Sequence, residues 1–236
     1  MLHFATIASA SASASFNTTK CPAYWELQAP TIPANFTLNE LPGQYYELAL
    51  HDLTQYPMCP TLPRCVTSNK TIRTHPDGVI YVHDAWNLEC VGGVYPETLL
   101  FNVTNEPGYF IAYTSLFKDV IFPDTVVAFK PGPSGWVLEF QCVEKNGAVD
   151  FVGINFYAKN RTSETAYDEM YAAGKARGID FYWNRGLGLA RVNQTGCSDA
   201  AVPASAPAAN DKFRHLERRG DDPPRWPQYE HFREGY

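Results

Sequence analysis

NFTLNELPGQYYEL, residues 35–48, is the stretch that decides the fold. It leads into Tyr45–Leu50, a run of aromatic and apolar residues that predicts a β-strand. Because successive side chains of a strand point to opposite faces, Tyr45, Glu47 and Ala49 are expected to share one face. We expect that face to point toward the core.

Short apolar runs continue along the chain, and turn residues separate most of them. The hairpin signal Asn146-Gly147 joins the runs Trp136–Cys142 and Asp150–Ala158. This regular alternation of runs and turns is typical of an all-β protein. Eight further strands are predicted, at Arg64–Ile72, Gly78–His83, Thr98–Val103, Tyr109–Thr114, Thr125–Phe129, Trp136–Cys142, Asp150–Ala158 and Gly188–Val192.

One segment has a helical period instead. Within Thr162–Gly178, Tyr167, Met170, Tyr171 and Gly174 fall on one face of a helix. The chain order is therefore eight strands, one helix and one strand. Strands linked by hairpins must close or cover their edges, and eight strands close around one small ligand. The sequence predicts an all-β, eight-stranded antiparallel up-and-down barrel with one C-terminal α-helix packed on its outside.

These features, in this order, resemble the lipocalin family. Lipocalins open with a short 3₁₀ turn and a strand that starts Gly-x-Trp-Tyr-Glu, and residues 43–47, GQYYE, are similar to that motif. Cys65 opens the second strand, a long strand ends in Cys142, and a strand that ends in residues 159–161, KNR, leads into the helix. The likeness covers residues 21–197. It is nearest to the apolipoprotein D-type lipocalins and more distant from the lipocalin domain of violaxanthin de-epoxidase.

Two departures accompany the resemblance. Tyr45 stands where the family has Trp, and the turn at residues 131–133, PGP, stands where the family has Thr-Asp-Tyr. The resemblance implies a basic residue over the motif aromatic, either Lys159 or Arg161, in a cation–π contact. It also implies three disulfide bonds, which are Cys21–Cys142, Cys65–Cys197 and Cys59–Cys90.

The residue pattern also indicates an oxidising compartment. The chain has more Asn-x-Thr acceptor sites than chance predicts, which is typical of a glycosylated protein of the secretory pathway. These sites lie at Asn17, Asn35, Asn69, Asn102, Asn160 and Asn193. The six Cys lack the close pairing of zinc sites, and their wide spacing suits disulfides. We therefore expect a secreted, extracellular protein without a metal site, although another oxidising lumen is an alternative.

Composition divides the chain into three parts. Residues 1–20 are rich in small residues and are interpreted as a targeting sequence or flexible lead, and residues 21–197 carry the barrel. Residues 198–236 are interpreted as an Ala/Pro linker and a disordered charged and aromatic tail. Residues 212–236 either remain solvated or dock on a protein partner. The net charge of −6 argues against nucleic-acid binding, and no apolar run is long enough for a membrane span.

The barrel interior is the expected binding site. On the strand Asp150–Ala158, one face is expected to pack under the helix (Val152, Ile154 and Phe156), and the other to point inward. With Tyr45 and Glu47, the inward face forms a cavity that we expect to be mostly apolar, as small-molecule sites usually are. The candidate ligand-binding residues are Tyr45, Glu47, Phe151, Asn155 and Tyr157.

The resemblance implies a carrier of a small hydrophobic molecule, such as a fatty acid, retinoid, pigment or sterol, with no cofactor and no catalytic residue. An alternative is an enzyme similar to violaxanthin de-epoxidase, which needs a poised carboxylic acid, and Glu47 is its only evident candidate. Another is a non-catalytic scaffold that docks through the C-terminal tail. His83-Asp84, placed at a strand end, is interpreted as a surface pair.

Overall fold

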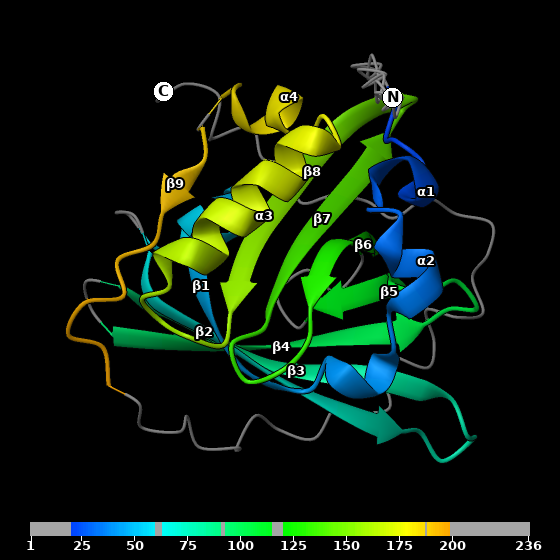
Figure 1. Ribbon diagram of the computed structural model, residues 1–236, viewed down its shortest axis with the longest axis horizontal. Helices are drawn as coiled ribbons and strands as arrows, with labels where there is room; N and C mark the ends of the chain where they lie inside the picture. Colours follow the sequence, from blue (N-terminus) through cyan, green and yellow to red (C-terminus); the bar gives the residue numbers. More distant parts are fainter. Residues whose placement is uncertain (1–19, 60–62, 91–92, 115–119, 187, 199–236) are drawn as a thin grey trace, which may run out of the picture.

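A computed structural model describes residues 20–59, 63–90, 93–114, 120–186 and 188–198. Eight antiparallel strands close into a barrel, because each strand pairs with the next and β1 pairs with both β8 and β2 (Figure 1). The expected fold class is confirmed. The strands are β1 (Gly43–Asp52), β2 (Arg64–Thr74), β3 (Ile80–Cys90), β4 (Gly93–Val103), β5 (Tyr109–Thr114), β6 (Phe122–Lys130), β7 (Trp136–Lys145) and β8 (Ala148–Ala158).

Both ends of the chain lie largely outside the described residues. Residues 1–19 of the expected lead, with the acceptor site Asn17, lie outside the described residues, and so do residues 199–236 of the expected tail. A short ninth strand, β9 (Ala190–Arg191), pairs with β1 and occupies only the middle of the predicted strand Gly188–Val192.

Several strands are longer than the apolar runs predicted, and β3 and β4 differ most. β3 runs on past His83 to Cys90, so the His83-Asp84 pair lies within the strand and the expected strand end is wrong. The reason is that polar residues such as Asp84 and Glu97 point into the barrel, where they interrupt an apolar pattern without interrupting the strand.

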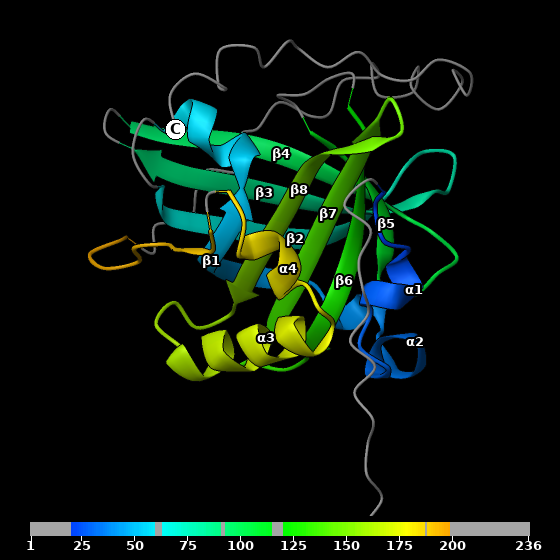
Figure 2. The same ribbon diagram turned by 90° about the horizontal axis from the view of Figure 1, so that it is seen from above.

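The main helix, α3 (Glu164–Ala176), confirms the predicted helical segment. The Ser163 hydroxyl accepts a hydrogen bond from the Ala166 N–H and caps its first turn. The helix lies along the outer face of β6, β7 and β8 (Figure 1). Figure 2 shows α3 on one side of the barrel and the N-terminal helices beside β5 and β6. The remaining helical segments are α1 (Tyr24–Leu27), α2 (Thr31–Asn35), η1 (Leu38–Glu40), η2 (Leu53–Met58) and α4 (Asp180–Trp183).

Two apolar clusters form the core of the fold. One fills the barrel interior and includes Tyr45, and the other lies between the barrel wall and α3 and includes Ile154 and Phe156. No helix in the described part of the chain is both long enough and apolar enough to cross a membrane.

A bulge in β1 changes the expected inward face. The pairing with β8 shifts register between Glu47 and Ala49, so Leu48 is an extra residue in this strand. Ala49 therefore packs in the outer cluster and not on the face of Tyr45 and Glu47, which corrects the expected alternation. The next interior apolar residue of β1 is Leu50.

Three disulfide bonds tie the ends of the fold to the barrel. They join Cys21 to Cys142, Cys59 to Cys90 and Cys65 to Cys197, the pairs that the resemblance implied. The cation–π contacts show that Lys159, and not Arg161, covers the motif aromatic Tyr45. The Lys159 Nζ lies 5.4 Å from the centre of the Tyr45 ring, whereas the Arg161 guanidinium covers the Tyr46 ring.

Candidate functional site

A narrow cavity occupies the half of the barrel away from Tyr45. The space between atoms in this region, counted together with adjoining open solvent, totals about 480 Å³. Every strand of the barrel except β2 contributes to its wall, and so does η2. Its apolar and aromatic lining consists of Trp86, Leu99, Phe101, Phe122 and Tyr157, and its polar lining of Asp52, Thr54, Gln55, Asp84, Glu97, Thr114, Glu139, Gln141 and Asn155.

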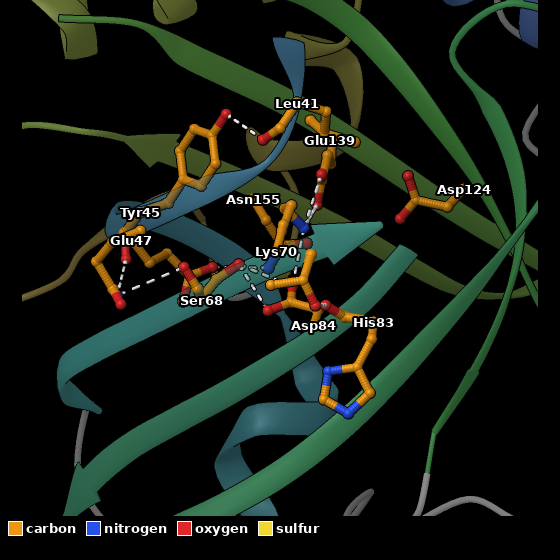
Figure 3. A network of polar contacts seen from close by, with 12 residues as sticks. Leu41, Tyr45, Glu47, Ser68, Lys70, His83, Asp84, Asp124, Glu139 and Asn155 are labelled. Carbon is orange, nitrogen blue, oxygen red and sulfur yellow. Dashed lines mark hydrogen bonds and ion pairs between the residues drawn. The ribbon is translucent and has the colours of Figure 1, made fainter. Parts of the chain in front are cut away.

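A buried ion cluster forms one side of this cavity (Figure 3). The Lys70 Nζ lies 2.9 Å from an Asp84 carboxylate oxygen and 3.1 Å from a Glu139 carboxylate oxygen. The Ser68 hydroxyl lies 2.7 Å and 2.9 Å from the two Asp84 oxygens. The Lys70 ammonium also lies over the rings of Phe101 and Tyr157. Two carboxylates hold its pKa above the ordinary value despite the burial, so Lys70 stays charged.

Glu47 lies behind the cavity wall, fully buried and with neutral amides as its hydrogen-bond partners. Asn155 Nδ2 donates to it at 2.7 Å, and Gln55 Nε2 donates to both of its oxygens. Burial raises the pKa of Glu47 to about 8, because the amides offset only part of the lost hydration and Asp52 adds a repulsive charge. Glu47 is therefore mostly protonated at neutral pH.

Asp124 is a second buried carboxyl, on β6. Gln141 Nε2 donates to one of its oxygens at 2.7 Å, and the other oxygen has no hydrogen-bond partner among the described residues. Burial and the nearby Glu139 charge raise its pKa well above the ordinary value. Figure 3 shows Asp124 apart from the Lys70 cluster. Among the buried residues that the structure describes, Lys70 is the one cation.

The structure places the candidate ligand-binding residues in two groups. Asn155 and Tyr157 line the cavity. Phe151 faces the interior as expected but packs on Phe122 in the core, and it does not line the cavity. Tyr45 closes the far end, where its hydroxyl donates to the Leu41 carbonyl oxygen at 2.7 Å. Tyr45, Glu47 and Phe151 are therefore buried beside the cavity and do not line it.

Sequence reasoning missed most of the polar lining. The cavity is not mostly apolar, since Asp52, Asp84, Glu97 and Glu139 all line it. The interpretation of His83-Asp84 as a surface pair is also wrong, because Asp84 is buried in the interior. A usable signal was the alternation of Ser68 and Lys70 and of Asp84 and Trp86 along their strands, which places each pair on one face.

His83 itself lies on the outer face of β3. Figure 3 shows its ring pointing away from the Asp84 carboxylate. Partial burial and the nearby Arg73 charge lower its pKa. His83 and Asp84 therefore do not act together on one ligand. No group of three His, Cys, Asp or Glu side chains in the described residues is placed to hold a metal ion.

Comparison with solved structures identifies the architecture. Apocrustacyanin C2 aligns with a TM-score of 0.55 and 12% sequence identity over 76% of this chain and 91% of that chain. Lobster apocrustacyanin A1 aligns with a TM-score of 0.52 and 12% identity over 75% of this chain and 89% of that chain. H1 crustacyanin from the lobster Homarus americanus aligns with a TM-score of 0.51 and 13% sequence identity over 76% of this chain and 88% of that chain.

This chain has the lipocalin fold. The structural neighbours are lipocalins, and the identities are low enough that the likeness concerns architecture alone. No protein-family model matches the sequence. No curated protein matches it either. What the cavity binds must therefore be argued from the residues that line it.

Proposed function

We propose that this lipocalin is a secreted glycoprotein that binds and carries a small hydrophobic molecule in its barrel. The cavity supports this proposal, because aromatic side chains from four strands (Trp86, Phe101, Phe122 and Tyr157) line it beside its polar groups. In a small-molecule site, apolar burial provides affinity and polar groups orient the ligand.

Two observations support secretion and glycosylation. Three disulfides suit an oxidising compartment. Of the five described acceptor asparagines, Asn35, Asn69, Asn160 and Asn193 are exposed, whereas Asn102 is half-buried. A glycan needs a surface position, so four of these five asparagines are open to attachment.

The cavity lining favours some of the expected ligands over others. A neutral ring, such as the ring end of a retinoid or pigment or a sterol fragment, matches the aromatic walls. A fatty acid matches less well, because its carboxylate would lie among Asp52, Glu97 and Glu139. The narrow space favours one ring with a short chain over a long acyl chain.

Binding of β-ionone, the ring fragment of many retinoids and carotenoids, tests this proposal. We expect it to quench the fluorescence of Trp86, which lines the cavity, with saturation at one ligand per chain. Leu99→Phe fills the cavity and should weaken binding about tenfold or more. Leu189→Phe makes the same change beside the outer cluster and should leave binding unchanged. Equal affinity in both variants, or no saturable binding, would refute binding in the barrel.

A second candidate is an enzyme that acts on a carotenoid-type ligand by acid catalysis, similar to violaxanthin de-epoxidase. The protonated Glu47 is the observation that favours it, because such a reaction needs a carboxylic acid at neutral pH. Against it, Asn155 and Gln55 engage both Glu47 oxygens, and Glu47 does not line the cavity. Turnover of an epoxy-carotenoid that Glu47→Gln abolishes without loss of binding would establish the enzyme over the carrier.

The division of the chain into parts and its likeness within the lipocalin family are proposed from the sequence. We propose the division into a lead at 1–20, a barrel at 21–197 and a tail at 198–236, and a likeness to apolipoprotein D-type lipocalins within the family. A role of residues 212–236 in docking a protein partner is tested by deleting them. The deletion should abolish capture of the partner and leave β-ionone affinity unchanged, whereas retained capture would exclude the tail.

A further inference from the structure

Gln55 connects the cavity to the buried Glu47. Gln55 belongs to η2 and lines the cavity, whereas Glu47 on β1 lies behind the cavity wall. The Gln55 Nε2 lies 3.1 Å and 3.0 Å from the two Glu47 carboxyl oxygens. The amide of Gln55 therefore lies between the space for a ligand and a fully buried carboxyl group.

The other end of the Gln55 amide lacks a partner. Gln55 is 2% exposed, and its Oε1 has no hydrogen-bond partner among the described residues. Because Nε2 is turned toward Glu47, Oε1 is the amide atom that remains to meet a ligand in the cavity. Buried acceptors are normally satisfied, so a polar group of the ligand has a defined partner here.

A half-turn of this amide exchanges its two ends. The oxygen and nitrogen of a glutamine amide are nearly equal in size, so rotation about the last side-chain bond replaces one by the other with almost no change in shape. Which end faces Glu47 then depends on the proton that Glu47 holds. An ionised carboxylate only accepts and pairs with Nε2, whereas a protonated carboxyl donates its O–H and pairs with Oε1.

The second amide beside Glu47 is fixed. Asn155 Nδ2 donates to Glu47 at 2.7 Å and also lies 3.3 Å from an Asp52 carboxylate oxygen, so both acidic groups hold it as a donor. Among the described contacts of the Gln55 amide, those to Glu47 are the only hydrogen bonds. Gln55 is therefore the amide that is free to turn when Glu47 gains or loses its proton.

Charged and titratable groups of five strands lie around Glu47. Asp52 and Glu139 contribute to its raised pKa, although burial is the largest cause. Burial raises the pKa of Glu47 to about 8, so both protonation states occur between pH 6.5 and pH 9. Tyr157 stays neutral in this range, because burial raises its pKa well above the ordinary value. The surrounding groups are Asp52 on β1, Lys70 on β2, Asp84 on β3, Glu139 on β7 and Tyr157 on β8.

We propose that Gln55 selects the polar group of the ligand and that the proton on Glu47 sets this selection. With Glu47 protonated, the Gln55 Oε1 accepts the Glu47 O–H, and Nε2 presents N–H donors to a carbonyl oxygen of the ligand. With Glu47 ionised, Nε2 faces Glu47 and Oε1 presents an acceptor, with which a carbonyl oxygen cannot pair. The ligand class at neutral pH is therefore a neutral ring molecule that carries a carbonyl group. This inference rests on the proposed function, because it specifies the ligand of the same cavity.

Two probes with the same carbon skeleton isolate the polar group. β-Ionone carries a ketone, which only accepts hydrogen bonds, and β-ionol carries a hydroxyl group, which donates and accepts. Titration calorimetry of the full chain should show β-ionone binding about fivefold or more weakly at pH 9 than at pH 6.5, because only the protonated fraction presents N–H donors. The affinity for β-ionol should change less than about twofold, because its hydroxyl group pairs with either end of the amide.

A matched pair of variants locates the proton. In Glu47→Gln, the new amide accepts from Asn155 and donates to the Gln55 Oε1 at every pH, so it imitates the protonated state. Its β-ionone affinity should therefore be the same at pH 9 and at pH 6.5. Asp124→Asn makes the same change at another buried carboxyl group with a raised pKa, and it should keep the pH dependence. Thermal unfolding at both pH values confirms that each variant is folded.

Gln55→Met tests the selecting residue itself. It removes both ends of the amide, so we expect weaker β-ionone binding at pH 6.5 and no difference between the two pH values. Thermal unfolding again confirms the fold. A Gln55→Met variant that keeps the pH dependence would assign the selection to another group and overturn this inference.

The other outcomes are also distinct. An equal β-ionone affinity at both pH values, or a β-ionol affinity that falls by the same factor, overturns this inference and leaves the carrier function intact. A pH dependence that Glu47→Gln retains, or that Asp124→Asn abolishes, overturns it as well. If neither probe binds at either pH, the proposed function fails together with this inference.

Discussion

Glu47 is a buried residue whose ionisation differs between the folded and the unfolded chain. Its pKa rises from an ordinary 4.5 to about 8 on burial. Between these values the folded chain holds a proton that the unfolded chain has lost. The contribution of Glu47 to stability is therefore full below about pH 4.5, falls as the pH rises to about 8, and is constant above that.

Glu47→Gln should remove this dependence, because the amide is neutral at every pH. We expect the variant to match the unaltered chain at pH 5 and to exceed its free energy of unfolding by about 2–4 kcal/mol at pH 9. Urea denaturation at the two pH values measures the difference. Glu164→Gln, on exposed α3, is the control and should show no such gain. Identical differences at pH 5 and pH 9 would contradict the assignment of the buried proton.

Lys70 should be essential for folding even though it adds a buried charge. Lys70→Met leaves Asp84 and Glu139 without their cation, and we expect a loss of about 3–5 kcal/mol in urea denaturation. Adding Asp84→Asn and Glu139→Gln to Lys70→Met should recover most of that loss, because no uncompensated charge then remains. A harmless single variant, or a triple variant no better than the single one, would contradict this account.

At the scale of the elements, the sequence predicted the parts of the barrel that depend on local pattern. The Asn146-Gly147 hairpin, the helix that starts after Ser163 and the inward face of β8 all agree with the structure. The face of Ala49 could not be predicted, because a bulge inserts one residue without any local signal in the sequence.

The candidate site was less predictable than the fold for a related reason. Lys70, Asp84 and Glu139 lie on three strands, and their contact depends on barrel closure and on the register of β2 against β3. Taken singly, each charged residue in a strand is typical of a solvent-facing position. The polar character of the cavity therefore becomes visible only when the strands are assembled.

The packing of α3 allows a prediction at this scale. A Cβ on Gly174 would lie 2.5 Å from the Trp183 ring, closer than atoms can pack. Gly174→Ala should therefore destabilise the fold by about 1–2 kcal/mol, although alanine is the better helix former. Thermal unfolding measures this, with Ala172→Gly on the exposed face as the control for helix propensity alone. A higher melting temperature for Gly174→Ala would show that Trp183 does not pack tightly on the helix.

For the whole molecule, the surface predicts a pattern of glycan occupancy. Asn160 lies in an exposed bend and Asn193 is exposed in a short bridge to Arg64, whereas Asn102 is half-buried within β4. We expect protein from a eukaryotic secreting host to lose mass on treatment with peptide-N-glycosidase, with the Asn-to-Asp conversion most complete at Asn160 and Asn193. Conversion should be least at Asn102. Peptide mass spectrometry reads each site, and an absence of conversion at all of them would contradict passage through the secretory pathway.

Native mass spectrometry tests most directly whether the barrel carries a ligand. The protein should be purified from a secreting host, freed of glycans and measured before and after denaturation. We predict a one-to-one adduct that denaturation releases, and that Leu99→Phe strongly reduces while Leu189→Phe retains it. An unliganded mass in every sample, together with no uptake of β-ionone, would contradict ligand binding in the barrel.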